Sequence, residues 1–177
     1  MTDQRIKKAA GLLRKNNLDV LLITEINHVR YLSGFTGSNG IVVISPNKSF
    51  FLTDFRYKVQ SQKEVKGCKV IIASRQLLTE LPMLPIFSKR TRIGFEADFV
   101  SVNSLTKFKE ILPDAEFKPT TQLVESLSIV KDAEEIRRVK KAVRIADKAF
   151  AEILDIIKPG IAEKDIALEL EYKMRKL

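Results

Sequence analysis

Apolar and polar positions follow two different periods along the first 120 residues. Arg5–Asn16 carries apolar residues at helical spacing, which predicts an amphipathic helix. The run Leu18–Thr24 is almost wholly apolar and predicts a buried strand. The same patterns predict further strands at 40–45, 49–53, 67–73, 91–95 and 115–118, and further helices at 55–65, 75–81 and 101–112.

Turn and capping residues connect these elements. Pro46-Asn47-Lys48 is a short link between two strands and predicts an antiparallel hairpin. The strand at Gly67–Ala73 is apolar and is expected to be buried. Pro82 is expected to end the helix at 75–81. Ser101 is expected to cap the next helix. Strands and helices that interleave in this way predict an α/β fold, with a mixed β-sheet flanked by helices.

The pattern changes near Val130, and long α-helices are expected from there on. Residues 132–157 contain no glycine or proline, and their apolar positions recur at strict 3-4 spacing, which predicts a helix of about seven turns. This apolar seam consists of Ile136, Val139, Val143, Ala146, Phe150, Ile153 and Ile157. Lys158-Pro159-Gly160 ends the helix, and a second one is expected from Ala162, with Ile166, Leu170 and Met174 inward. No stop signal precedes Leu177, so we expect a truncated chain.

Charge and composition limit the function classes. The chain has 31 Lys and Arg against 22 Asp and Glu, a net charge of +9, but the basic residues are scattered and no nucleic-acid-binding motif is present. We therefore expect no specific nucleic-acid partner. No apolar run is long enough to span a bilayer, and a single cysteine, Cys68, excludes an intrachain disulfide. These features predict a cytoplasmic protein without a membrane partner.

Few residues offer catalytic chemistry. One histidine, His28, and one cysteine make a zinc site improbable by count, although a carboxylate-only site stays open. Cys68 begins an apolar strand and is expected to be a buried structural thiol, and His28 is expected to be a partly exposed loop residue. The three glycines Gly34, Gly37 and Gly40 lead into a strand, whereas a phosphate-binding loop leads into a helix. We expect them to allow sharp turns and close packing.

Four segments taken together carry a family resemblance. They are NHVRYLSGFTGSNG at 27–40, LTDFRY at 52–57, SIVK with EEI at 128–136, and KPGIAE at 158–163. Each is weak alone, but their order and spacing over nearly the whole chain resemble the Xaa-Pro peptidases, the family of creatinase, prolidase and aminopeptidase P. The resemblance implies a creatinase/prolidase-type N-terminal α/β domain at 1–121, a linker at 122–129, and the first helices of a truncated pita-bread catalytic domain at 130–177.

The resemblance also implies what the chain lacks. The two-metal site of the family is built from two Asp, one His and two Glu, all downstream of the helix that ends at Leu177. We therefore expect no metal ligand, no cofactor and no catalytic residue in this chain, which should be inactive alone. The full-length parent resembles a metallopeptidase that acts on proline-containing peptides with two divalent ions (Mn, Co or Zn). A creatinase, or a binding module of the same fold without metals, remains an alternative.

Candidate site residues come from the same resemblance. In the homodimers of the family, the N-terminal domain of one subunit approaches the active site of the other, which would place the loop Phe35–Gly40 and the segment Asp54–Tyr57 near that rim. Phe35, Asp54, Arg56 and Tyr57 are the candidates. Arg56 is expected to contact a substrate carboxylate or the partner subunit, because its fork binds carboxylates bidentately. The alternative is structural: Asp54 and Arg56 cap the following helix and pin the hairpin.

One position departs from the family pattern. After Pro-Gly the family usually has Thr or Ser before Glu, whereas Ala162 precedes Glu163 here. A hydroxyl at this position would accept a hydrogen bond from an early helix N–H. We expect the second long helix to form but to fray at its start.

Overall fold

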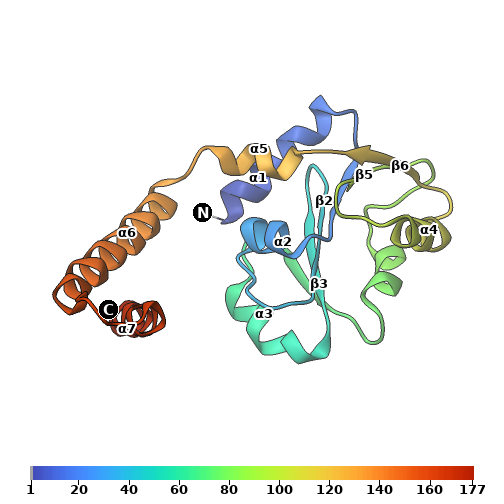
Figure 1. Cartoon of the computed structure of the whole chain (residues 1–177). Coiled ribbons are helices and arrows are strands. Elements are labelled where there is room, and N and C mark those ends of the chain that lie inside the picture. Colours follow the sequence, from blue (N-terminus) through green and yellow to red (C-terminus); the bar gives the residue numbers. More distant parts are fainter. Residues whose placement is uncertain (1) are drawn as a thin grey trace. The chain divides into compact units, whose positions relative to one another are not determined.

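The computed structural model describes residues 2–177 and divides into two compact units, Met1–Ile129 and Val130–Leu177. We call them the α/β unit and the helical unit. The α/β unit contains one six-stranded sheet with the order β4-β3-β2-β1-β5-β6 (Figure 1). The strands are β1 (Val20–Ile23), β2 (Ile41–Ile44), β3 (Ser49–Thr53), β4 (Lys69–Ile72), β5 (Arg92–Glu96) and β6 (Glu116–Thr120).

The sheet is mixed, as the sequence predicted. β2 pairs antiparallel with both β1 and β3, and the remaining neighbours pair parallel. The β2–β3 link is the predicted antiparallel hairpin, with Ile44 opposite Ser49. β4 lies at the edge of the sheet and is half exposed, so the expectation of a buried strand was wrong there. Among the described residues β4 pairs only with β3, and its side chains Val70 and Ile71 pack at the margins of the two cores.

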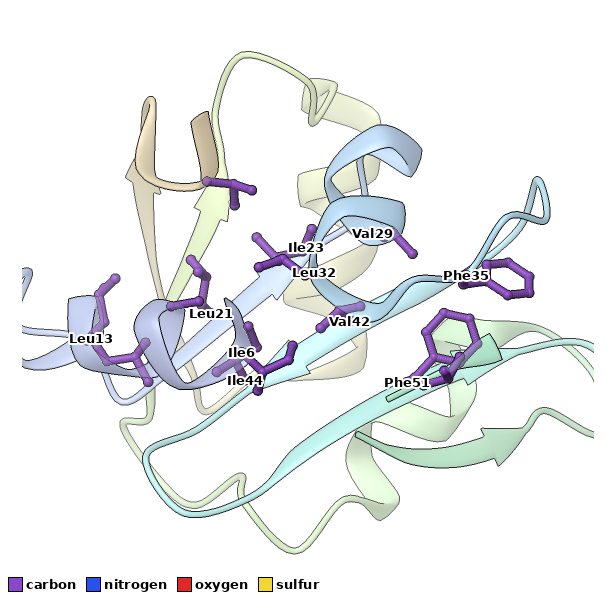
Figure 2. Packing of buried hydrophobic residues seen from close by; sticks show 14 residues of the cluster. Ile6, Leu13, Leu21, Ile23, Val29, Leu32, Phe35, Val42, Ile44 and Phe51 are labelled. Atoms are coloured by element: carbon purple, nitrogen blue, oxygen red, sulfur yellow. The ribbon is translucent and has the colours of Figure 1, made fainter. Parts of the chain in front are cut away.

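Alternate residues of the central strands supply two separate cores. Leu21 and Ile23 of β1 lie in a cluster with α1 (Thr2–Lys15), α2 (Ile26–Ser33) and α5 (Leu123–Ile129) (Figure 2). Val20 and Leu22 lie in a second cluster with η2 (Leu77–Met83) and α4 (Val102–Ile111). Because side chains of a strand alternate between its faces, each central strand contributes to both cores.

Two helices, α2 and η2, differ from the prediction. Residues 26–33 form helix α2, capped at its start by Glu25 and ended at Gly34, whose φ is 84°. This places His28 on a helix, so the expectation of a loop histidine was wrong. Pro82 lies inside the 3-10 helix η2 and does not end it. The hydrogen bonds of η2 bypass the missing proline N–H, as in the bond from Leu84 N to the Leu81 carbonyl.

The segment at 122–129, expected to be a linker, forms helix α5 of the α/β unit. Val124 is buried in the first core, and the Tyr31 hydroxyl donates to the Leu127 carbonyl at 2.9 Å. Phe55–Tyr57 is a 3-10 turn (η1) that leads into α3 (Lys58–Glu64), within the predicted helix. α4 begins after Ser101, whose hydroxyl accepts from Ser104 N, which confirms the predicted cap.

The helical unit consists of α6 (Ala133–Ile153), a 3-10 turn η3 (Leu154–Ile156) and α7 (Glu163–Lys176). This confirms the predicted long helix. Asp132 and Glu135 form a reciprocal capping box at its start. α7 packs on α6 and buries Ala149 and Ile153. Ile153 is thus the buried member of the predicted seam, and most of the seam is exposed: Ile136, Val139, Val143, Phe150 and Ile157. Within residues 2–177, no helix is both long and apolar enough to cross a membrane.

Candidate functional site

The antiparallel pairing of β2 and β3 brings the glycine-rich loop and the LTDFRY segment together. Ile41 at the start of β2 lies opposite Leu52 near the end of β3. The loop that precedes β2 and the turn that follows β3 therefore emerge side by side. All four candidate residues named from the sequence lie in these two segments.

Phe35 supports this region from inside. Its ring is fully buried and lies tilted on Phe51, with centroids 4.7 Å apart (Figure 2). It also makes an edge contact with the Tyr57 ring, with centroids 5.3 Å apart. Gly37 passes close over these rings: a Cβ built there would lie 2.3 Å from Phe35 Cζ and 2.7 Å from Tyr57 Cε1. Only glycine fits this approach without displacing the aromatic rings.

Asp54 is the centre of the polar network. Its Oδ1 accepts from Arg56 N at 3.0 Å and Arg56 Nε at 2.9 Å, and its Oδ2 accepts from Arg56 Nη2 at 2.8 Å and Asn39 Nδ2 at 2.6 Å. The carboxylate is mostly buried, but these donors favour its charged form. The Arg56 guanidinium above all holds the pKa of Asp54 well below its usual range. Asp54 both caps η1 and fixes Arg56, as the structural alternative proposed.

Arg56 is already engaged on one edge of its fork. Nε and Nη2 bind Asp54 bidentately, so this edge of the guanidinium cannot bind a second carboxylate bidentately. Nη1 has no hydrogen-bond partner within residues 2–177, and 59% of the side chain is exposed. Arg56 therefore presents one fixed, free donor edge to solvent.

The loop itself is held on both sides. Thr36 N and its hydroxyl donate to the Glu64 carboxylate at 2.7 and 2.9 Å, and the Ser38 hydroxyl lies 2.6 Å from the Tyr57 hydroxyl. The bonds from Ser38 lower the pKa of Tyr57. The Thr53 hydroxyl donates to the Asn39 carbonyl at 2.6 Å. The loop is thus preorganised by its neighbours and presents a fixed surface.

An open groove of about 560 Å³ runs beside Asp54 and Arg56. It lies at the carboxyl ends of the parallel strands β3 and β4, where ligands of open α/β sheets commonly bind. One wall comes from the loop and the turn after β3, and the other from residues after β4. Its lining residues are Asn39, Ile41, Asp54, Phe55, Arg56, Ser74, Arg75, Gln76, Leu77 and Leu78.

Comparison with known families identifies the family of the chain. The model of the creatinase/prolidase N-terminal domain matches residues 5–130, and the model of metallopeptidase family M24 matches residues 137–177. The chain belongs to the creatinase/prolidase family. This confirms the resemblance and the predicted fold class.

Peptidases are among the relatives of this creatinase/prolidase-family chain. The uncharacterized peptidase YqhT of Bacillus subtilis (strain 168) is 39% identical over 172 residues, which cover 97% of this chain and 48% of YqhT. A Xaa-Pro dipeptidase from Bacillus anthracis superposes with a TM-score of 0.90 at 35% identity, covering 99% of this chain and 49% of that one. The chain spans about half the length of the curated relatives it matches.

A third relative corresponds to the α/β unit by itself. The N-terminal domain of the cytoplasmic peptidase PepQ from Mycobacterium tuberculosis H37Rv superposes with a TM-score of 0.61 at 28% identity. The match covers 70% of this chain and 98% of that structure.

Sequence reasoning missed a second polar cluster in the creatinase/prolidase domain. His28 Nδ1 lies 2.5 Å from Glu96 Oε1, and its Nε2 lies 3.8 Å from Glu125 Oε1. Glu96 Oε2 also accepts from the backbone N–H groups of Thr24 and Glu25, at 2.8 and 2.9 Å. Glu96 thereby satisfies two backbone N–H groups just before the start of α2. His28 and Glu96 are 68 positions apart, so no local pattern pairs them.

The remaining candidates stay structural. Cys68 is half-buried rather than fully buried, and burial raises the pKa of its thiol to about 12, which favours the protonated form. Within residues 2–177, no three His, Cys, Asp or Glu side chains converge to hold a metal ion. The described residues do not fit the divalent metals of family M24, and we derive no catalytic step through a metal here.

Proposed function

We propose that this chain works as part of a metal-dependent Xaa-Pro peptidase of the prolidase or aminopeptidase P type. One observation carries the proposal: two family matches, to the creatinase/prolidase N-terminal domain and to metallopeptidase family M24, follow one another along a single chain. A relative that matches this chain over 99% of its length is a Xaa-Pro dipeptidase. The substrates are therefore proline-containing peptides, and the metals are bound by residues that this chain does not contain.

Within that enzyme, the α/β unit forms part of the substrate-site rim and contributes to a homodimer. Asp54, Arg56 and Tyr57 are the rim residues, and buried Phe35 holds the loop beneath them. The fixed donor edge of Arg56 supports this role, because a preorganised guanidinium binds an anion with little loss of side-chain entropy. The description of PepQ as a cytoplasmic peptidase supports a cytoplasmic location for this chain too.

A fusion protein tests the proposal. The chain is joined to the second half of the Bacillus anthracis dipeptidase and assayed with Mn²⁺ on Leu-Pro and Gly-Pro. We expect hydrolysis of both dipeptides, and none by this chain alone or by the second half alone. Creatine in place of the dipeptides tests the creatinase alternative. A folded fusion that cleaves neither dipeptide, or that cleaves creatine instead, would contradict the proposal.

A further inference from the structure

The second wall of the groove carries a cation that the family resemblance did not single out. Arg75 lines the same groove as the Asp54–Arg56 pair and lies on the segment that follows β4. It is exposed and makes no hydrogen bond or ion pair within residues 2–177. The nearby Glu80 carboxylate accepts instead from Ser74 N and the Ser74 hydroxyl, at 3.1 and 3.2 Å. Glu80 is not among the residues that line the groove.

The charge balance of the groove is therefore positive. Arg56 and Arg75 face one carboxylate, Asp54, whose two oxygens already accept four hydrogen bonds. The donors left open are Nη1 of Arg56 and the whole guanidinium of Arg75. Such donors match carboxylates, which accept hydrogen bonds from a guanidinium in its plane.

Apolar side chains also line the groove. Phe55, Leu77 and Leu78 line it, and 76% of Phe55 is exposed. A volume of about 560 Å³ is in the range of pockets that hold small ligands. The groove thus combines an apolar wall with two separate cationic positions. A short peptide with one apolar residue and two carboxylates complements all three features.

We propose that this groove binds acidic peptides, and that Arg75 selects those with a second carboxylate in addition to the chain terminus. Arg56 holds the terminal carboxylate, and Arg75 holds the acidic side chain. The inference rests on the proposed function, because that function decides that the terminal carboxylate of the peptide lies at Arg56. It adds Arg75 as a specificity-determining residue beside Arg56. Exposed ion pairs of this kind contribute about two- to fivefold in affinity, and salt screens them.

Peptide binding to the chain itself tests the inference without hydrolysis. Leu-Pro-Glu and Leu-Pro-Gln, which differ only in the second carboxylate, are titrated into ¹⁵N-labelled protein at low ionic strength. We expect shifts at Asn39, Arg56 and residues 74–78 with both peptides, and about two- to fivefold tighter binding of Leu-Pro-Glu. The preference should disappear at 0.5 M salt, because the Debye length is then roughly three times shorter than at low salt and the ion pairs are screened.

Three variants separate the roles. Arg75→Gln should remove the preference for Leu-Pro-Glu and leave Leu-Pro-Gln unchanged, whereas Arg56→Gln should weaken both peptides. Arg14→Gln, at an exposed arginine of α1 outside the groove, is the matched control and should change neither. Equal affinity for the two peptides, shifts outside the groove, or no binding of either would overturn the inference. Failure of the fusion to cleave dipeptides would count against the proposed function alone.

Discussion

At the residue scale, close approach and hydrogen bonding explain how the site is built from the described residues. Gly37 lets the loop lie on Phe35 and Tyr57, and Asp54 orders Arg56. The sequence predicted these residues as a group, but it could not predict that Asp54 would occupy the fork of Arg56. That arrangement depends on Asn39, which reaches Asp54 only because β2 and β3 pair in register.

Gly37→Ala should destabilise the α/β unit. The new Cβ would overlap two aromatic rings, one of them fully buried, and such overpacking costs about 1–3 kcal/mol. Gly11→Ala is the matched control, because nothing lies within 4 Å of its Cβ position in α1. It should stabilise the helix by up to about 1 kcal/mol. Urea unfolding measures both, and equal effects of the two substitutions would contradict the close approach.

Asp19→Asn should make the folding stability of the protein less sensitive to acid. The Arg92 guanidinium, which bonds both Asp19 oxygens, lowers the pKa of Asp19 to about 2. A depressed pKa means that the carboxylate stabilises the folded state above its unfolded value of about 3.9, and that this contribution is lost as the pH falls toward 2. The effect is modest because 42% of the side chain is exposed.

The measurement is urea unfolding of both proteins at pH 5 and pH 2.5. The natural protein should lose more stability between these values than Asp19→Asn, which cannot ionise. Identical losses would show that the Asp19–Arg92 pair contributes nothing to folding.

At the element scale, most of the fold followed from apolar periodicity, and the exceptions have physical reasons. The buried central strands and the long helix α6 were predictable because their patterns are strong. Helix α2 was not, because it has eight residues and its start is closed by Glu96, a residue 70 positions away. α5 was missed for the same kind of reason: its buried contacts are with α1, α2 and the first core, not with its own neighbours in sequence.

Ala162→Thr should stabilise the start of α7. Ala162 occupies the N-cap with extended backbone and offers no side-chain hydrogen bond, as expected from the sequence. A hydroxyl there should contribute about 0.5–2 kcal/mol and slow amide exchange at Lys164 and Asp165. Asp132→Ala, which removes the capping box of α6, should have the opposite sign. Unchanged or faster exchange at the two α7 amides would place the cap elsewhere.

At the scale of the whole molecule, the two units differ in how much apolar surface they bury. The α/β unit has two extensive cores, whereas the helical unit buries Ala149 and Ile153 and leaves most of its seam exposed. Exposed apolar surfaces of this kind usually mark contacts with other protein. The seam was predicted from its spacing, but the sequence could not show that α7 would leave most of it exposed.

The exposed seam should make the chain self-associate. Sedimentation should show dimers or larger species whose fraction rises with concentration. Val143→Glu, in the middle of the seam, should shift the chain toward monomer, and Lys140→Glu, on an exposed position of the same helix outside the seam, should not. A strict monomer at all concentrations would refute the association.

The most direct test of the account is the activity of Arg56→Ala in the fusion with the Bacillus anthracis second half. Because the α/β unit is proposed to supply a substrate-facing residue, kcat/KM for Leu-Pro should fall by about two- to fivefold, as expected for loss of an exposed ion pair to the substrate. The melting temperature should change little, because Asp54 keeps its bonds from Asn39 and the backbone N–H of residue 56. A clear fall in melting temperature with unchanged kcat/KM per folded molecule would show that Arg56 only pins the hairpin.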